Sequence, residues 1–347
     1  MTSSPAPLTV ADYEPLARAR TEPAAWDYQV GGAGDERSLA DNIAAWGRLR
    51  LRPRVLVDVA ERDLSTHVLG LDLPHPIVVA PTASHRLSHP EAEAATARGA
   101  AAAGALYTLS TIASVPMEEV AAAAPGAPHW FQLYAPADRE ACRAIVDRTV
   151  AAGHRGIVLT VDLPLPGNRE RDLRSGFAVE VGAHLPEDQP VDPHTGLVVL
   201  PTLDWAYLDW LRSVCPIPLI AKGVLRADDA LRAVDAGCDA IWVSNHGGRQ
   251  LDTAIAPADA LPEIAEALGG RVPLIVDGGV RRGIDALKGL ALGADLVAVG
   301  RPVLWGLAVD GADGVQRVLE ILRDELSLAM ALAGCRTIND IGADLLA

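Results

Sequence analysis

A short polar motif directly after an apolar run carries the residue types that could do chemistry. Residues 240–243 read Ala-Ile-Trp-Val, and residues 244–252 read Ser-Asn-His-Gly-Gly-Arg-Gln-Leu-Asp, so His246 and Arg249 lie three positions apart. The two glycines between them allow a sharp turn and a close approach to a ligand. A histidine exchanges protons near neutral pH, and an arginine binds a carboxylate through two parallel hydrogen bonds. The pair therefore indicates proton abstraction from a small organic acid, although an isolated motif of this kind is also typical of an ordinary polar loop.

Eight short apolar runs place this motif in a repeating pattern. Amphipathic segments of helical period alternate with the runs, most clearly at 91–103, 139–152, 227–236, 261–268, 283–292 and 314–333. This alternation predicts an α/β fold of the (β/α)8 TIM-barrel class. A doubly wound sheet is the main alternative, but Pro81-Thr82-Ala83 follows the first run instead of a glycine-rich turn. The runs are 76–80, 105–110, 129–133, 156–161, 217–221, 240–244, 273–277 and 295–300.

Two segments fall outside the repeat. Residues 1–75 precede the first strand, and we expect them to form helices that cap the barrel, with a small hairpin near residues 60–73. Residues 170–203 contain several prolines and glycines and show no periodicity. A loop of this length after the fourth strand is typical of a lid, a binding loop or a disordered segment. We expect residues 1–347 to form a single domain.

The bulk composition excludes several classes of function. A net charge of −15 disfavours nucleic acid as a partner. Four cysteines without metal-ligand spacing indicate buried thiols in a reducing compartment and no metal site. The N-terminus lacks the pattern of a signal peptide, and no apolar stretch is long enough for a membrane span. We therefore expect a cytoplasmic protein without a membrane partner.

Polar residues collect where the predicted strands end. In a TIM barrel the catalytic groups lie at the carboxyl ends of the strands, so this clustering predicts an active site there. The residues at or just beyond these ends are Thr82, Ser110, Gln132, Tyr134, Thr160, Asp162, Arg169, Lys222, Ser244, His246, Arg249, Asp277, Arg281 and Arg301.

The last two strand ends indicate a phosphate site. Gly278-Gly279 and Gly300-Arg301 offer backbone amides and a guanidinium at the loops where barrels commonly bind phosphate. Lys222 is either a Schiff-base lysine or a fixed positive charge beside a cofactor ring, and the nearby His246 and Arg249 favour the second. Asp162 either accepts a hydrogen bond from His246 or caps the following segment.

Ordered motifs along nearly the whole chain resemble the FMN-dependent 2-hydroxy-acid oxidase and dehydrogenase family. They run from about Tyr13 to Ile338. They are Asp27-Tyr28, Arg52-Pro53-Arg54, Ala80-Pro81-Thr82-Ala83, His89-Pro90-Glu91, Phe131-Gln132-Leu133-Tyr134, Thr160-Val161-Asp162, Lys222-Gly223, residues 244–252, Asp277-Gly278-Gly279-Val280-Arg281 and Gly300-Arg301-Pro302.

The resemblance implies a role for each matching residue. His246 resembles the active-site base and Asp162 its acidic partner, while Tyr134 resembles the tyrosine beside the substrate hydroxyl. Arg249, Arg169 and Tyr28 match the groups that hold the substrate carboxylate. Lys222 matches the lysine near flavin N1 and O2. The matching FMN-binding residues are Pro81, Thr82, Ala83, Ser110, Gln132, Thr160, Lys222, Ser244, Asp277, Gly278, Gly279, Arg281, Gly300 and Arg301.

The chain departs from glycolate oxidase around the substrate side chain. Ile112 stands where that enzyme has a pocket tryptophan, Gln29 replaces a second tyrosine, and Pro166 replaces a larger apolar residue.

The resemblance implies FMN-dependent oxidation of an (S)-2-hydroxy acid to the 2-oxo acid, with the Cα–H leaving as a proton or as a hydride. We expect molecular oxygen as the acceptor, giving hydrogen peroxide, and a homotetramer. The alternatives are a dehydrogenase that uses a quinone or another carrier and, more remotely, a non-flavin phosphate-binding lyase or isomerase.

Overall fold

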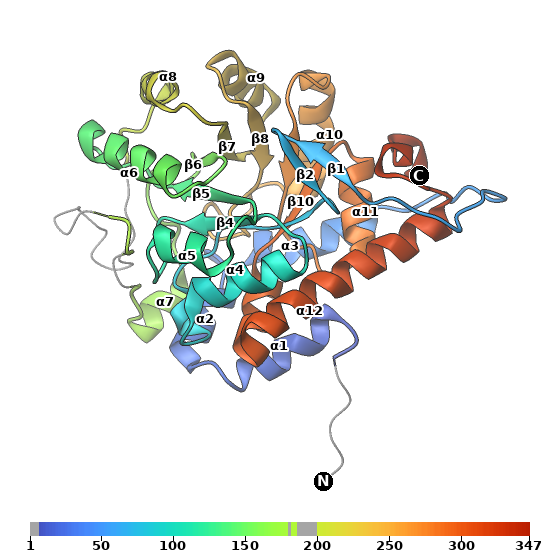
Figure 1. Cartoon of the computed structure of the whole chain (residues 1–347), viewed down its shortest axis with the longest axis horizontal. Helices are drawn as coiled ribbons and strands as arrows, with labels where there is room; N and C mark the ends of the chain where they lie inside the picture. The colour runs from blue at the N-terminus through green and yellow to red at the C-terminus, as the bar shows by residue number, and fades with distance from the viewer. Residues whose placement is uncertain (1–6, 180–181, 186–199) are drawn as a thin grey trace, which may run out of the picture.

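Eight parallel strands form a closed barrel in the computed structural model, which describes residues 7–179, 182–185 and 200–347 (Figure 1). Each strand pairs with the next along the chain, and the last pairs with the first. The predicted (β/α)8 barrel is therefore confirmed, and the doubly wound sheet is excluded. Every predicted apolar run matches a strand, and only β7 extends beyond its run, which was predicted to end at residue 221. The strands are β3 (Ile77–Val79), β4 (Tyr107–Ser110), β5 (His129–Leu133), β6 (Ile157–Thr160), β7 (Leu219–Val224), β8 (Ala240–Val243), β9 (Leu274–Val276) and β10 (Leu296–Val299).

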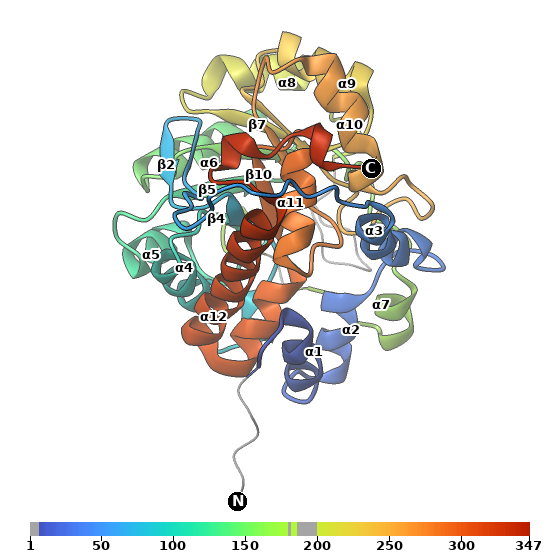
Figure 2. The same ribbon diagram turned by 90° about the vertical axis from the view of Figure 1, so that its right-hand side faces the viewer.

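Helices surround the barrel, and Figure 2 shows α11 and α12 side by side on its outside. The six predicted helical segments are confirmed. The helix predicted from residue 314 is the second part of α12, which begins at Arg301. Non-helical backbone angles at Asp310 and Gly311 kink α12 just before residue 314 and separate its two parts. The helices α5 and α8 were not predicted. The helices are α4 (Ala92–Ala102), α5 (Met117–Ala123), α6 (Arg139–Ala151), α7 (Glu170–Ser175), α8 (Trp205–Val214), α9 (Ala227–Asp235), α10 (Pro257–Leu268), α11 (Gly283–Ala291) and α12 (Arg301–Ala333), with 3-10 helices η1 (His85–Leu87), η2 (Ile338–Asp340) and η3 (Ala343–Leu345).

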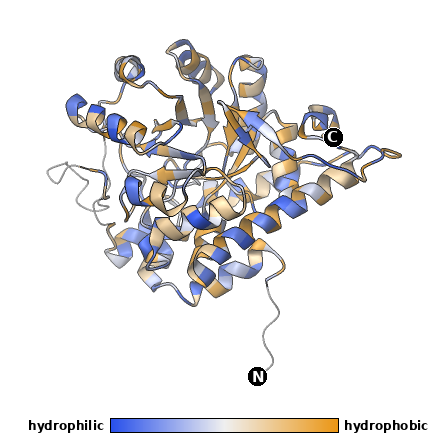
Figure 3. Ribbon diagram, viewed as in Figure 1, coloured by the Kyte–Doolittle hydropathy of each residue, from blue (hydrophilic) through white to orange (hydrophobic). Residues whose placement is uncertain are grey.

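Two sets of side chains fill the barrel, because alternate residues of a strand point to the same face. Hydrophobic residues dominate the strands, as Figure 3 shows. The lower set is mostly apolar and consists of Val78, Thr108, Trp130, Val158, Ile220, Trp242, Ile275 and Ala298. The upper set lies two residues further along each strand and consists of Ala80, Ser110, Gln132, Thr160, Lys222, Ser244, Asp277 and Gly300. The polar groups thus gather at one end of the barrel.

The opposite end is closed by a hairpin of β1 (Thr66–Val68) and β2 (Leu71–Leu73). Val68, Leu71 and Leu73 are buried in one cluster with residues of the lower set, so the predicted hairpin seals the bottom of the barrel. The N-terminal helices cover the other end, where Trp46 Nε1 donates a hydrogen bond to Gly278 O over 2.8 Å. These helices are α1 (Val10–Arg18), α2 (Pro23–Val30) and α3 (Arg37–Arg48).

The segment predicted to be an irregular lid-like loop, residues 170–203, begins instead with a helix. The prediction was wrong for α7, whose six residues are too few to show a helical period. The helix ends at Gly176, which adopts a φ of 67°. Further along, Ala183 N donates to Ala113 O over 3.0 Å and ties residues 182–185 to the loop after β4. Residues 180–181 and 186–199 of the predicted loop lie outside the described residues.

In the described part of the chain, no helix is both long and apolar enough to cross a membrane. All four cysteines are buried free thiols, as their spacing predicted.

Three buried histidines cluster beside β5. His129, His154 and His184 are 4%, 2% and 2% exposed, and the His129 and His154 ring centroids lie 5.8 Å apart. Phe131 packs between them, with its centroid 6.1 Å from the His154 ring and 5.2 Å from the His184 ring. Burial lowers the pKa of each of the three histidines to about 4. They are therefore neutral in the folded protein at neutral pH.

Acid should destabilise the fold through this cluster. The pKa of each histidine is lower in the folded state than its ordinary value of 6.5, so the stabilisation is complete above pH 6.5 and declines as the pH falls towards 4. One histidine with such a shift contributes about 3 kcal/mol at the acid limit. We expect urea unfolding to give a smaller free energy at about pH 5 than at about pH 7.5, and His184→Phe to reduce this difference.

The control is His67→Gln, because the His67 side chain is 64% exposed. An unchanged pH dependence in His184→Phe would contradict the role of the cluster.

Candidate active site

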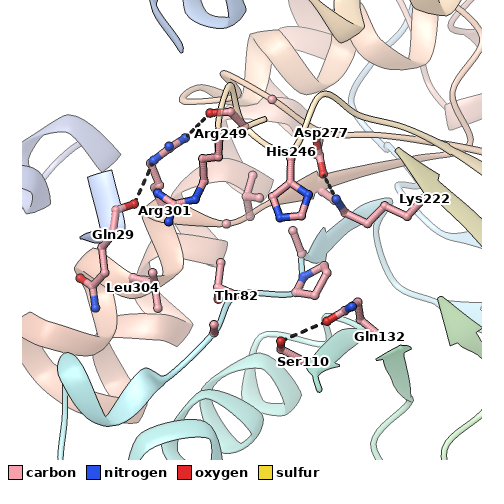
Figure 4. Close-up of a pocket in the computed structure, with 18 of the residues that line it drawn as sticks. Gln29, Thr82, Ser110, Gln132, Lys222, His246, Arg249, Asp277, Arg301 and Leu304 are labelled. Atoms are coloured by element: carbon pink, nitrogen blue, oxygen red, sulfur yellow. Dashed lines mark hydrogen bonds and ion pairs between the residues drawn. The ribbon is translucent and has the colours of Figure 1, made fainter. Parts of the chain in front are cut away.

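A cavity opens at the carboxyl end of the barrel, above the upper set (Figure 4). Residues from the ends of all eight strands line it, together with residues of α2 and α12. The structure thus brings together predicted site residues that are far apart in the sequence. Those that line the cavity are Tyr28, Pro81, Thr82, Ala83, Ser110, Gln132, Tyr134, Thr160, Arg169, Lys222, His246, Arg249, Asp277, Gly278, Gly279, Arg281, Gly300 and Arg301.

Three predicted site residues, Asp162, Ile112 and Ser244, do not line the cavity, and several lining residues were not predicted. Ala80 and Ala298 could have been found from the two-residue period of the strands. Leu304 comes from the first turn of α12, and only the tertiary fold brings it to the cavity. Gln29, which the sequence placed around the substrate side chain, also lines the cavity, and the remaining unpredicted lining residues are Gly247, Val280 and Val299.

A chain of hydrogen bonds fixes the Gln132 amide. Ser110 Oγ donates to Gln132 Oε1 over 3.1 Å, and Gln132 Nε2 donates to Thr160 Oγ1 over 3.0 Å. All three side chains are buried and belong to the upper set on neighbouring strands β4, β5 and β6. The amide therefore presents a defined pattern of donor and acceptor to the cavity.

Lys222, Ser244 and Asp277 form a second network on β7, β8 and at the end of β9. Lys222 Nζ donates to Ser244 Oγ over 3.1 Å, and Ser244 Oγ donates to Asp277 Oδ1 over 2.7 Å. Lys222 Nζ also lies 3.6 Å from Asp277 Oδ2. Ser244 is fully buried behind the cavity wall and bonds to the other two residues, and its predicted contact with the cofactor stays a prediction.

The turn after β8 holds His246 at the cavity. His246, Gly247 and Gly248 have φ values of 58°, 66° and 75°, all in the left-handed region. This run requires the glycines, and a Cβ on Gly248 would lie 2.6 Å from Leu39 N of α3. Ser244 Oγ accepts a hydrogen bond from His246 N over 3.1 Å, which supports the strained residue from below.

His246 lies between a carboxylate and a phenol. His246 Nδ1 is 3.0 Å from Asp162 Oδ1, and His246 Nε2 is 3.3 Å from Tyr134 Oη. The carboxylate selects the tautomer in which Nδ1 donates, so Nε2 is left as the basic atom. Burial lowers the pKa of His246, and Asp162 opposes that effect. Burial acts to raise the pKa of Asp162, but the interactions with His246 and Lys222 and a backbone hydrogen bond together keep that pKa below its ordinary value.

Arg249 and Arg169 lie side by side at the same part of the cavity. Arg249 Nη1 donates to Tyr28 O over 2.6 Å and to Gly31 O over 2.8 Å, and its guanidinium carbon lies 4.9 Å from the Tyr28 ring centroid. Burial and the neighbouring Arg169 lower the pKa of Arg249 to about 10. The two guanidinium groups thus create a site that favours an anion.

Arg301 and Arg281 add further positive charge to the cavity, and Arg301 shares the Gly31 carbonyl with Arg249. Arg301 donates only to backbone carbonyls, at Gln29 O, Gly247 O and Gly31 O. The Arg281 guanidinium carbon lies 5.0 Å from the Trp305 ring centroid. Burial lowers the pKa of both arginines, to about 10 for Arg281. Among the described residues, no carboxylate lies within 4.0 Å of the guanidinium groups of these two arginines, or of Arg249 and Arg169.

Ile112 packs beside the cavity instead of lining it. It is fully buried in an apolar cluster with Tyr28 and Val179. A Cβ on Gly182 would lie 2.6 Å from Ile112 Cα, so the segment 182–185 covers this residue. Ile112 thus influences the shape of the cavity from behind its wall, and its predicted direct contact with a substrate stays a prediction.

Comparisons with known proteins agree with this geometry. A model of the FMN-dependent dehydrogenase family matches residues 17–347. The chain is 47% identical to L-lactate oxidase of Nostoc sp. over 100% of both chains, and 44% identical to 2-hydroxyacid oxidase 1 of Homo sapiens over 97% of this chain and 96% of the relative. A solved structure of mandelate oxidase with (S)-2-phenylpropionate superposes with a TM-score of 0.89 at 42% identity, covering 98% of each chain.

The family model covers almost the whole chain, and the relatives match it at more than 40% identity over nearly their full length. The fold and the anion-binding end of the cavity agree with that match. The chain therefore belongs to the FMN-dependent dehydrogenase family.

Proposed function

We propose that this protein oxidises an (S)-2-hydroxy acid to the 2-oxo acid and passes the electrons to molecular oxygen, giving hydrogen peroxide. The observation that carries the proposal is the juxtaposition of a carboxylate-paired His246 with Arg249 and Arg169 in one cavity. The relatives named as lactate and 2-hydroxyacid oxidases support both the substrate class and the acceptor.

The cavity fits FMN. The phosphate has a matching environment at Arg281, Arg301 and the N-terminus of α12, where positive charge has no carboxylate partner in the described chain. Gly279 has a φ of 79°, and a Cβ there would lie 2.0 Å from Asn42 O, so the turn packs tightly and leaves backbone at the cavity. Gln132 and Lys222 would hold the polar edge of the ring. FMN, when bound, accepts the two electrons removed from the substrate.

The remaining groups bind and orient the hydroxy acid. Arg249 and Arg169 hold the carboxylate, and the backbone carbonyls of α2 fix the Arg249 guanidinium in place. The substrate carbon is then presented to His246, whose Nε2 takes the proton. Asp162 stabilises the imidazolium that forms, and Tyr134 Oη lies within reach of the same nitrogen.

The network around Lys222 disfavours the lyase alternative. Lys222 donates to Ser244 and lies near the Asp277 carboxylate, so it acts as a fixed positive charge and not as a nucleophile.

A dehydrogenase that uses a quinone or another carrier is the second candidate, because the family description itself names dehydrogenases. The cytoplasmic location and the homotetramer stay predictions, and analytical ultracentrifugation tests the second.

An anaerobic screen tests the activity. We expect an (S)-2-hydroxy acid to bleach the bound flavin, and subsequent admission of oxygen to restore the colour with formation of peroxide. A series of acids with increasing side-chain size, from lactate to mandelate, shows which substrate side chain the protein accepts. If no 2-hydroxy acid bleaches the flavin, the proposed function is wrong. If bleaching occurs but oxygen restores the colour only slowly while a quinone restores it quickly, the protein is a dehydrogenase.

His246→Ala should retain FMN but lose flavin reduction. The histidine makes no contact that the phosphate end requires, whereas loss of a general base costs at least about a hundredfold in rate. Stopped-flow absorbance measures the reduction, and the visible spectrum measures the bound flavin. The control Asp162→Asn keeps the base but weakens the stabilisation of its charged form, so we expect a smaller loss. This loss should shrink as the pH falls, because without the carboxylate the pKa of His246 is lower and the base stays neutral to lower pH. A parental reduction rate in His246→Ala would refute the mechanism.

Arg249→Lys should mainly weaken substrate capture. Lysine cannot contact two backbone carbonyls and also form a bidentate pair with a carboxylate, so we expect the substrate dissociation constant to rise by roughly ten- to a hundredfold. The concentration dependence of flavin reduction gives this constant. Arg226→Lys is the matched control, because Arg226 is exposed and pairs only with Asp228. Equal dissociation constants in the two variants would show that Arg249 is no carboxylate clamp.

A further inference from the structure

Two tryptophans in the lower set of the barrel differ in one hydrogen bond. Trp130 on β5 and Trp242 on β8 are both fully buried and belong to the same interior cluster. Trp242 Nε1 donates to Asp277 Oδ2 over 3.0 Å. Trp130 Nε1 has no acceptor among the described residues and lies against Gly156, at the start of β6. Only Trp242 therefore connects the apolar interior with the polar end of the barrel.

The Asp277 carboxylate receives this bond in a crowded network. Its Oδ1 accepts from Ser244 Oγ, while Trp242 Nε1 and the Lys222 ammonium share its Oδ2 at 3.0 and 3.6 Å. The indole is the closer of these two donors, and it carries no charge. Lys222 thus remains outside direct hydrogen-bond distance of Asp277 and keeps its bond to Ser244. Figure 4 shows the Lys222 and Asp277 side chains directed toward each other at the cavity.

We propose that Trp242 is a positioning residue that preserves the positive charge of Lys222 for the flavin site. By occupying Asp277 Oδ2, the indole N–H prevents the carboxylate from drawing the ammonium into a close ion pair. Without this donor the buried carboxylate would seek a replacement, and the ammonium is the nearest candidate. A closer Lys222–Asp277 pair would leave less positive field in the cavity to stabilise a reduced, anionic ring.

The test compares Trp242→Phe with Trp130→Phe. Both variants remove the same atoms from fully buried rings of the same interior cluster, but only the first removes a hydrogen bond to Asp277. The first variant also alters the ring that faces the Lys222 ammonium, whose Nζ lies 5.7 Å from the Trp242 ring centroid. The readout is the reduction potential of the bound flavin, measured against a reference dye with a chemical reductant. We expect Trp242→Phe to lower the reduction potential of the bound flavin. At a fixed solution potential, the ratio of reduced to oxidised flavin should then fall roughly three- to tenfold. We expect Trp130→Phe to leave the ratio unchanged.

Equal potentials in the two variants, or a higher potential in Trp242→Phe, would overturn the proposal. Site-specific incorporation of 3-benzothienylalanine at position 242 keeps the ring that faces Lys222 and deletes only the N–H. The same fall in potential is required of this variant, which also replaces Trp242→Phe if that variant does not fold. A second readout separates positioning from general damage: the rate of flavin reduction by substrate should fall while the substrate dissociation constant stays at its parental value.

The inference rests on the flavin site of the proposed function but not on turnover of a hydroxy acid. The potential is measured without substrate, so a protein that binds FMN and oxidises no 2-hydroxy acid would still give the difference between the two variants. Failure of the proposed activity and failure of this proposal are therefore distinguishable.

Discussion

Unpaired positive charge at the mouth of the barrel is the constraint on which the rest of the structure depends. Four arginines line one cavity of a protein whose net charge is −15, and no carboxylate in the described chain lies within ion-pair distance of them. Removing such groups from water is costly unless hydrogen bonds or counter-charges compensate. In the complex proposed here, the FMN phosphate and the substrate carboxylate would supply that compensation.

Backbone carbonyl groups supply the rest of the compensation for the buried arginine charges. Carbonyl groups of α2 and of the turn after β8 accept from Arg249 and Arg301, which ties the N-terminal helices to the barrel. The left-handed turn at residues 246–248 contributes to both functions, because it brings the His246 ring to the cavity and points the Gly247 carbonyl at Arg301. The parts of the molecule that cover the site are therefore the parts that hold its charges.

Much of this organisation could be predicted from the sequence. The strands were predictable because parallel strands covered on both sides are continuously apolar, and their polar ends were predictable because such barrels place their chemistry there. Ser244 and Ile112 lie behind the cavity wall, and a sequence does not show which of several adjacent side chains lines a cavity and which supports it. The helix α7 was missed because six residues are too few for a period, and Leu304 because only tertiary packing brings it to the site.

The two sets of side chains inside the barrel also limit how the chain can change its length. Insertion of one residue within a strand would exchange its inner and outer faces. Insertion of two residues would restore the faces but carry the apolar side chain into the position of the polar one, so that Trp242 would take the place of Ser244 or Ile220 that of Lys222. Neither event is compatible with the cavity. Length variation in descendants of this chain is therefore confined to loops and helices. Within each strand, the number of residues between the closed end of the barrel and the cavity must stay the same.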